Sequence, residues 1–283
     1  MSASELFTMN IGFVFTNYNN SRFTREAVQS ILANKSADSL RIVIVDNASE
    51  PGDIENLRRI AAEFPEIHVI FNPENSGYFK GLNIGISILR ELFPDVGHLV
   101  VGNNDLVFPP TFVEAVHARR GVFKEYPVVC PDLVTLGGAH QNPHVVAEIS
   151  KARELMYDLY FSSYLAAKMI AFVAKATRKL TERKDYRRYQ VPGTIYQGYG
   201  ACYILGPLFL KHFGLLWAPT FLMGEEFFLS KQLQDKGYKL YYEPAIVVQH
   251  HDHASVGNVP VRKMWCISRD SHRVYRKYVR IFR

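Results

Sequence analysis

The sequence lacks the features that would place it in several large classes of protein. Its three cysteines, Cys130, Cys202 and Cys266, lie too far apart for metal-ligand spacing, so we expect buried thiols in a reducing compartment. No run of about 18 apolar residues could cross a membrane. The first ten residues lack the basic and apolar segments of a signal peptide. These absences predict a cytoplasmic protein.

Common nucleotide-binding signatures are missing too, since neither a Walker A sequence nor G-x-G-x-x-G occurs. The 283 residues are 48% hydrophobic and 21% charged, which suits one large α/β domain with an appendage. The net charge of +6 is uneven. Residues 262–283 carry eight Lys and Arg against one acid, and residues 151–188 carry ten against four, so the rest is acidic. Such basic segments fit an anionic lipid surface, a pyrophosphate-bearing substrate or nucleic acid.

Strand and helix patterns alternate through the first 135 residues, which predicts a mostly parallel, twisted sheet with helices on both faces. Residues 150–180 contain no Pro or Gly and predict one long helix, within an inserted helical arm at about 150–190. We therefore expect a single domain over residues 1–261 and a basic, amphipathic C-terminal helix over 262–283. The predicted strands are 11–16, 41–46, 68–71, 98–101, 128–130, 198–205 and 239–249, and the predicted helices are 22–34, 53–64, 77–92 and 225–236.

Polar residues follow several of these strands. The fourth strand runs into Asn103-Asn104-Asp105, at the carboxyl edge where open α/β folds bind ligands. Tyr18 and Asp46 follow the first two strands, where a tyrosine can stack on a base and a carboxylate can accept the imino proton of uracil or thymine. Turn residues or helix caps are the alternative interpretation. Three glycines four residues apart then open a helix, which would let backbone and ligand approach closely: Gly77, Gly81 and Gly85.

The order and spacing of these motifs resemble the family 2 inverting glycosyltransferases of the GT-A fold. The similarity is greatest to the rhamnosyltransferase-like branch that builds bacterial surface polysaccharides, and it covers about residues 10–280 apart from the arm. The matching motifs are Thr16-x-Tyr18-Asn19, Asp46-Asn47-x-Ser49, Glu74-Asn75-x-Gly77, Asn103-Asn104-Asp105, Gly200-Ala201-Cys202, Gly224-Glu225-Glu226, Gly237-Tyr238, and Pro244 followed by His250.

The resemblance implies roles for these residues. Asp105 and His250 would hold a divalent metal, Mn²⁺ or Mg²⁺, that bridges the donor diphosphate. Glu226 would be the catalytic base, with Glu225 as the alternative; a purely electrostatic role at a helix N-terminus is the competing interpretation. Leu82 departs from the Arg of many relatives, and Lys80 would compensate. The nucleotide-sugar site would comprise Thr16, Tyr18, Asp46, Asn75, Gly77, Lys80, Asn103, Asn104, Gly200 and Ala201.

The same resemblance implies transfer of rhamnose from dTDP-rhamnose to a lipid-linked glycan, in O-antigen, capsule or cell-wall polysaccharide synthesis. Alternatives are another donor, such as a UDP-hexose or galactofuranose, or a non-catalytic carbohydrate- or nucleic-acid-binding module on the same core. A nucleotidyltransferase is disfavoured because residues 17–21 lack its Gly-rich loop with Arg. A zinc site at residues 249–253 is disfavoured because consecutive histidines on a strand point to opposite faces.

The basic segments predict the partners. An arginine stripe on one helical face would dock at the inner face of the bacterial cytoplasmic membrane, and the arm would serve similarly or pack on a second subunit in a homo-oligomer. A solvated basic face is the simpler alternative, and we expect no nucleic-acid partner. The stripe consists of Arg269, Arg273, Arg276, Arg280 and Arg283.

Overall fold

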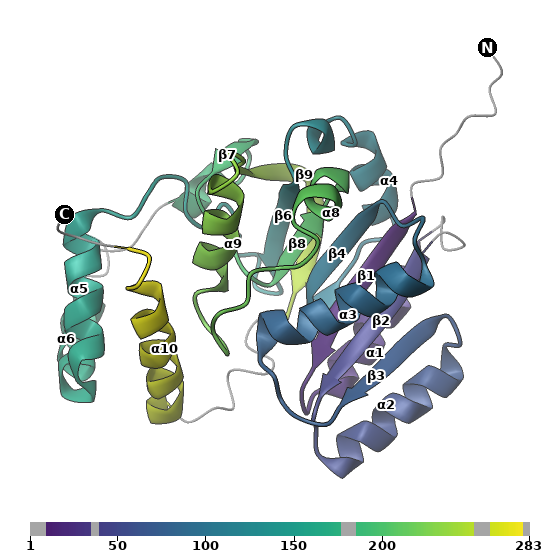
Figure 1. Cartoon of the computed structure of the whole chain (residues 1–283), viewed down its shortest axis with the longest axis horizontal. Coiled ribbons are helices and arrows are strands. Elements are labelled where there is room, and N and C mark those ends of the chain that lie inside the picture. The colour runs from purple at the N-terminus through teal and green to yellow at the C-terminus, as the bar shows by residue number, and fades with distance from the viewer. Residues whose placement is uncertain (1–9, 35–39, 177–184, 252–260, 280–283) are drawn as a thin grey trace.

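A computed structural model describes residues 10–34, 40–176, 185–251 and 261–279. Its centre is one mixed sheet, in the order β3-β2-β1-β4-β8-β6-β9-β5, with β7 paired to β9 (Figure 1). The pairings of β3, β2, β1 and β4 are parallel, whereas β8 runs antiparallel to β4 and β6. The strands are β1 (Ile11–Asn17), β2 (Leu40–Asn47), β3 (Ile67–Asn72), β4 (His98–Asn103), β5 (Leu106–Val107), β6 (Val128–Thr135), β7 (Gly193–Ile195), β8 (Cys202–Leu205) and β9 (Leu240–His250).

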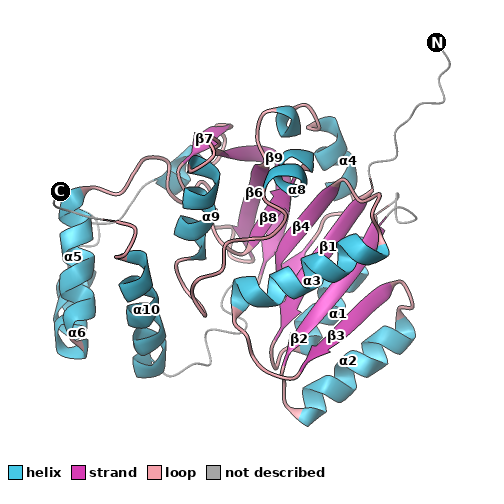
Figure 2. Cartoon of the chain, in the orientation of Figure 1, coloured by secondary structure: helices cyan, strands magenta, loops and turns pink. Residues whose placement is uncertain are grey.

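Helices cover both faces of the sheet, as the sequence predicted (Figure 2). On one face of the sheet, helices α1, α2 and α4 pack on Phe13, Phe15 and Ile44. On the other face, helices α3, α8 and α9 pack on Val14 and Val45. Successive strand residues therefore bury opposite faces, and the central strands have no wet side. The helices are α1 (Ser21–Leu32), α2 (Pro51–Glu63), α3 (Tyr78–Leu92), α4 (Phe112–Ala118), α5 (Lys151–Ser162), α6 (Tyr164–Ala176), α8 (Pro207–His212), α9 (Glu225–Gln234) and α10 (Val261–Tyr275).

The arm is a hairpin of two helices, so the prediction of one long helix over residues 150–180 is wrong. The chain is extended at Ser163, with φ −155° and ψ 154°, and the Ser163 hydroxyl accepts a hydrogen bond from the Ala166 amide. A serine in this conformation is a good N-cap. It ends α5 and starts α6, so the two helices lie side by side (Figure 1). Residues 177–184 of the predicted arm lie outside the described residues.

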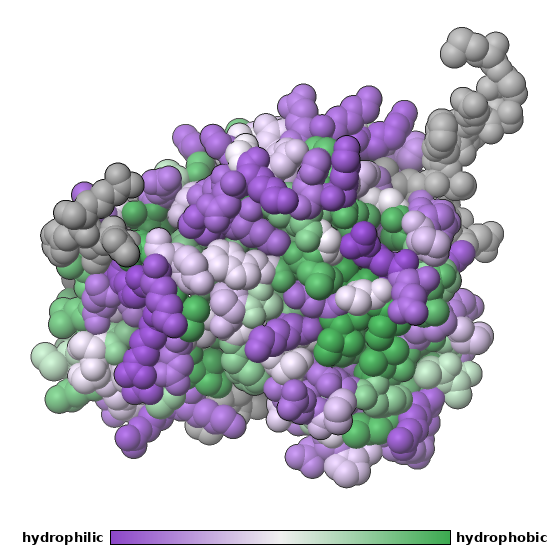
Figure 3. Space-filling view, in the orientation of Figure 1, coloured by the Kyte–Doolittle hydropathy of each residue, from purple (hydrophilic) through white to green (hydrophobic). Residues whose placement is uncertain are grey.

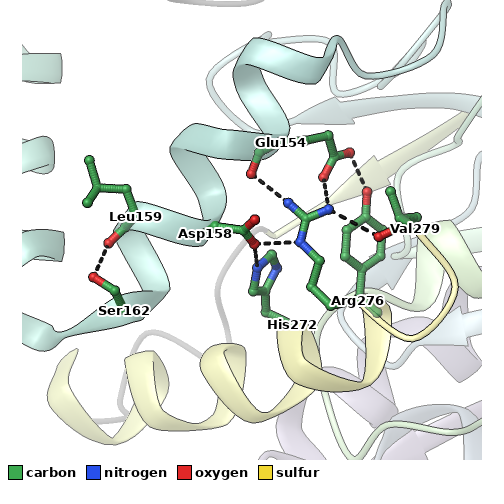
Figure 4. Close-up of polar contacts among 8 residues, drawn as sticks. Glu154, Asp158, Leu159, Ser162, His272, Arg276 and Val279 are labelled. Atoms are coloured by element: carbon green, nitrogen blue, oxygen red, sulfur yellow. Dashed lines mark hydrogen bonds and ion pairs between the residues drawn. The ribbon is translucent and has the colours of Figure 1, made fainter. Parts of the chain in front are cut away.

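The C-terminal helix α10 packs against α5 through a cluster of charged side chains (Figure 4). The Arg276 guanidinium pairs with Glu154 at 3.0 Å and also with Asp158, and His272 Nε2 lies 2.8 Å from the same Asp158 carboxylate. Tyr275 donates its hydroxyl hydrogen to Glu154. These contacts join the arm to the C-terminal helix.

These contacts divide the predicted arginine stripe. Only 18% of the Arg276 side chain is exposed, so this arginine faces protein and is not available to a membrane. Arg273 is 68% exposed and, like Arg269, pairs with Asp270. Arg280 and Arg283 lie outside the described residues. In the described part of the chain, every helix is too short or too polar to cross a bilayer.

Substitution of Arg276 should test how much the charged cluster stabilises the fold. Arg276→Ala would leave Glu154, which is 5% exposed, without its cation, so we expect a loss of about 3 kcal/mol in the free energy of unfolding. Arg273→Ala is the matched control, because an exposed ion pair contributes less than about 1 kcal/mol. Urea unfolding measures both, and equal effects of the two substitutions would contradict this account.

Candidate active site

An asparagine ends each of the four parallel strands at the carboxyl edge of the sheet: Asn17, Asn47, Asn72 and Asn103. The register places Asn17 opposite Asp46 and Asn47 opposite Asn72. Asn72 donates to the Asn47 side-chain oxygen at 3.3 Å, and Asn47 donates to the Gly77 carbonyl at 3.1 Å. The predicted ligand-binding edge is thus lined with side-chain amides, two of which bind each other.

Asn17 is the centre of a buried polar network at this edge. Its amide nitrogen donates to Asp46 at 2.9 Å and to Asp53 at 2.7 Å, while its oxygen accepts from Thr24 and from Asn104. Asp46 is fully buried, and both of its carboxylate oxygens accept hydrogen bonds within the network. In this arrangement Asp46 and Asn104 hold the strand ends together through their hydrogen bonds. Contacts of these two residues with a nucleoside stay a prediction.

The exposed part of this edge is Tyr18, whose side chain is 47% exposed. Among the described residues, three non-glycine residues adopt the left-handed conformation, and all three lie in or next to motifs identified in the sequence: Asn19 at φ 54°, Ala48 at φ 59° and Met223 at φ 73°. Strained residues of this kind persist where the surroundings fix them, and they gather at functional sites. A hollow of about 520 Å³ opens beside Asn19, between α1 and α2, but none of the metal or base candidates lines it.

The glycines before and within α3 contact protein in this structure. A side chain at Gly77, whose φ is +93°, would meet the Phe221 carbonyl at 2.2 Å, and one at Gly81 would meet Asn47 and Thr16. The space on the Cα side of Gly77 and Gly81 is thus occupied by a loop and by the end of the sheet, and the approach of a ligand to these glycines stays a prediction. Asn75 accepts a hydrogen bond from the Gly77 amide, and Lys80 is exposed. Ligand contacts by Thr16, Asn75, Gly77 and Lys80 stay predictions.

The two predicted metal ligands lie face to face. His250 ends β9 opposite Leu106, so its Nε2 atom lies 3.2 Å from Asp105 Oδ1; both side chains are at most 3% exposed. Neither of these two atoms has a hydrogen-bond partner among the described residues. Gln141 Oε1 lies 2.7 Å from His250 Nδ1, which places the ring proton on Nδ1 and leaves a lone pair on Nε2. Two buried acceptors that face each other fit a divalent cation.

The neighbouring His251 does not converge on this point. His251 Nε2 pairs with Glu26 at 2.9 Å, on a different side from His250, as the alternation of a strand requires. Asp252 and His253 lie outside the described residues. No group of three or more potential metal ligands occurs among residues 10–34, 40–176, 185–251 and 261–279. The described protein residues thus supply two ligands, and oxygen atoms of a bound diphosphate could complete the shell.

The two base candidates open α9 and differ in environment. Glu225 is 5% exposed, and burial, together with the charge of Glu226, raises the pKa of the Glu225 carboxyl to about 8. Its Oε1 atom has no hydrogen-bond partner in the described part of the chain. Glu226 is half-buried and lies against Gly200, where an added Cβ would meet its Oε1 at 2.8 Å. Of the two, Glu226 is the one that an acceptor could reach.

Residues 199–201 connect the two base candidates to the two predicted metal ligands. The Tyr199 ring centroid lies 6.0 Å from that of His250, the Gly200 carbonyl accepts a hydrogen bond from Tyr78, and the Ala201 carbonyl accepts one from Asn103. Burial raises the pKa of the Tyr78 hydroxyl well above its usual value, and the charges of Glu225, Asp105 and Glu226 raise it further. The contacts of residues 199–201 thus link Glu226 to His250, which faces Asp105.

Comparisons with known proteins agree with this architecture. Residues 13–121, well under half of the chain, match the family model described as Glycosyl transferase family 2. None of the curated proteins matches the sequence. The fold is of the GT-A type. These matches agree with the mostly parallel α/β fold predicted from the sequence, and the family match is confined to residues 13–121.

Solved structures resemble the chain at low sequence identity. A mannosyltransferase, PcManGT from Pyrobaculum calidifontis, in complex with GDP-Man and Mn²⁺, has a TM-score of 0.54 and 17% identity. GalNAc-T7 with UDP, GalNAc and Mn²⁺ has a TM-score of 0.59 and 14% sequence identity. Residues 1–349 of TarS from S. aureus have a TM-score of 0.51 and 12% sequence identity. The alignments cover 94%, 89% and 83% of this chain but only 62%, 45% and 60% of those structures. The likeness therefore concerns the fold.

Sequence reasoning missed one segment of the site, His140-Gln141-Asn142-Pro143. His140 pairs with Asp132, and Gln141 fixes His250. Asn142 donates to the Pro131 carbonyl and accepts from the Tyr199 amide, both at 2.8 Å. A run of polar side chains a few residues after a buried strand was the available signal, but the partners Tyr199 and His250 lie about 60 and 110 residues away.

The raised pKa of Glu225 predicts a pH-dependent stability. Because the folded-state pKa is about 8 and the ordinary value is 4.5, the protonated form stabilises the fold at low pH, and this contribution is lost as the pH rises through 8. Glu225→Gln should therefore raise the melting temperature by roughly 5 °C at pH 9 and leave it unchanged below pH 4.5. Thermal melts from pH 4 to 9 measure the effect. The exposed Glu91→Gln is the control, and parallel curves for Glu225→Gln and the native protein would refute the prediction.

The Gln141–His250 contact predicts a change in metal affinity. Gln141→Ala removes the acceptor that holds the His250 proton on Nδ1, so Mn²⁺ should bind about 10- to 100-fold more weakly. Gln141→Glu keeps an acceptor oxygen and should bind Mn²⁺ almost as well as the native protein. A titration of the nucleotide-free protein followed by electron paramagnetic resonance measures both. Equal Mn²⁺ affinity of Gln141→Ala and the native protein would show that the contact has no such role.

Proposed function

We propose that the protein is a metal-dependent, inverting glycosyltransferase that moves rhamnose from dTDP-rhamnose to a lipid-linked glycan at the inner face of the cytoplasmic membrane. The observation that carries the proposal is the facing pair of buried acceptors, Asp105 Oδ1 and His250 Nε2, in one region with Glu226. The family 2 match over residues 13–121 supports the activity. Two of the similar structures contain a nucleotide or nucleotide-sugar together with Mn²⁺.

The reaction is a single displacement. An acceptor hydroxyl oxygen attacks the anomeric carbon as the bond from that carbon to the diphosphate oxygen breaks, and the hydroxyl proton passes to the Glu226 carboxylate. Attack from the face opposite the leaving group inverts the anomeric centre. A divalent cation held by Asp105 and His250 would offset the charge on the departing nucleoside diphosphate.

The protein's own groups prepare this step. Gln141 orients the His250 ring, and Gly200, which has no Cβ, leaves space for the Glu226 carboxyl group. Glu225 lies buried beside Glu226, and with a pKa of about 8 its carboxyl group is protonated at neutral pH. Tyr18 offers an exposed ring on which a base can stack.

A different donor is the second candidate. The similar structures contain GDP-Man in one case and UDP with GalNAc in the other, which favours a hexose donor such as a UDP-hexose. Thermal shift with Mn²⁺ and a panel of dTDP, UDP and GDP separates these donors, because stabilisation grows with occupancy. Stabilisation by none of the three would overturn the proposed activity.

Substitution of Glu226 tests the assigned base. Glu226→Gln should keep nucleotide binding in the thermal-shift assay but lose sugar transfer by at least about 100-fold, since general-base catalysis typically contributes that much. Glu225→Gln, measured alongside, should retain transfer. If Glu226→Gln turns over at the native rate and Glu225→Gln does not, the base is Glu225.

A further inference from the structure

The outer helix of the arm, α6, exposes a stripe of large apolar side chains. Leu165, Met169 and Phe172 are 69%, 63% and 78% exposed, and their spacing of four and three residues places them on one face of the helix. Val173 is 57% exposed beside them. Figure 3 shows apolar side chains along this outer, left-hand edge of the molecule. Contiguous exposed apolar surface of this kind indicates a binding partner.

The other helix of the arm, α5, also exposes large apolar side chains. Leu155, Met156 and Leu159 are each more than 40% exposed, whereas Ala167 is the buried apolar residue that α6 contributes to the described structure. The inner side of the arm is occupied, because Tyr164 contacts Trp265 of α10 and Trp265 donates to the Tyr160 carbonyl. The outward side therefore contributes little to folding within one chain.

The charges of the arm are sorted between these two sides. Its acids over residues 151–176 are Glu154 and Asp158, and both pair with α10 through Arg276, with His272 also contacting Asp158. Lys168 and Lys175 are exposed on α6, seven residues apart and hence in one row beside the apolar stripe. Arg262 and Lys263, exposed at the start of α10, add positive charge nearby, and Arg262 lies over the Tyr164 ring.

An apolar stripe bordered by cations, with its acids turned inward and paired, fits an anionic lipid surface better than an apolar protein face. Lysine stems can lie along the acyl chains while their ammonium groups stay among the headgroups. We propose that α6, supported by α5, docks the protein on an anionic membrane. This inference rests on the lipid-linked acceptor of the proposed function, and it assigns the contact to the arm and not to the C-terminal arginine stripe.

Cosedimentation of the full-length protein with vesicles tests the proposal. The native protein should bind vesicles with 30% phosphatidylglycerol and bind pure phosphatidylcholine far more weakly. Replacement of Leu165, Met169 and Phe172 together by serine should reduce binding at least tenfold, and Lys168→Glu and Lys175→Glu should each reduce it about fivefold or more. Arg273→Glu, an exposed arginine of α10, is the control and should change binding less than twofold.

Two further measurements separate the outcomes. Nucleotide binding by thermal shift should be unchanged in the serine variant, so a loss of vesicle binding there is not a loss of fold. Absence of native binding to anionic vesicles, or native-like binding by the serine variant, overturns the docking proposal and leaves the transferase proposal intact. A native dimer that becomes monomeric in the serine variant, without vesicle binding, would instead assign the face to a second copy of the chain.

Discussion

The buried side chain of Asn17 is the constraint on which the site depends. It has no exposed surface, and its amide joins the ends of β1 and β2 to the starts of α1 and α2 through Asp46 and Asp53. A buried amide or carboxylate without partners is costly, so each member of the network holds the others in place. Asn104 is one of those members, and it directly precedes Asp105. The position of the candidate metal ligand is thereby fixed from inside the protein.

A second set of contacts brings the distant half of the chain to this edge. Asn142 ties the end of β6 to Tyr199, while its neighbour Gln141 holds the His250 ring. Gly200 then contacts both Tyr78 and Glu226. Hydrogen bonds and packing contacts among four segments therefore bring the two predicted metal ligands and the two acids into one part of the molecule.

The local pattern of the sequence predicted the elements of the fold that local interactions determine. Alternating apolar runs located the first four strands and three helices, and polar residues after strands located Asp105 and the carboxyl edge. The pattern failed where a single contact decided the outcome: the Ser163 cap divides a helix that lacks any Pro or Gly. It also failed for Arg276, because periodicity shows which residues share a face but not which acids on α5 that face meets. Gln141 was missed for the same reason.

The helix α10 links the arm to the part of the candidate active site that contains Glu226. On one side it pairs with α5 through Arg276, and on the other Tyr275 packs edge-on against Phe227 at 4.4 Å between ring centroids, next to Glu226. Ser271 also donates to the Leu222 carbonyl, in the loop that precedes α9. A surface that docks through α6 would thus be held at a fixed distance and orientation from Glu226. The arginine that the sequence pattern assigned to the membrane instead pairs with Glu154 and Asp158, and so joins the C-terminal helix to α5.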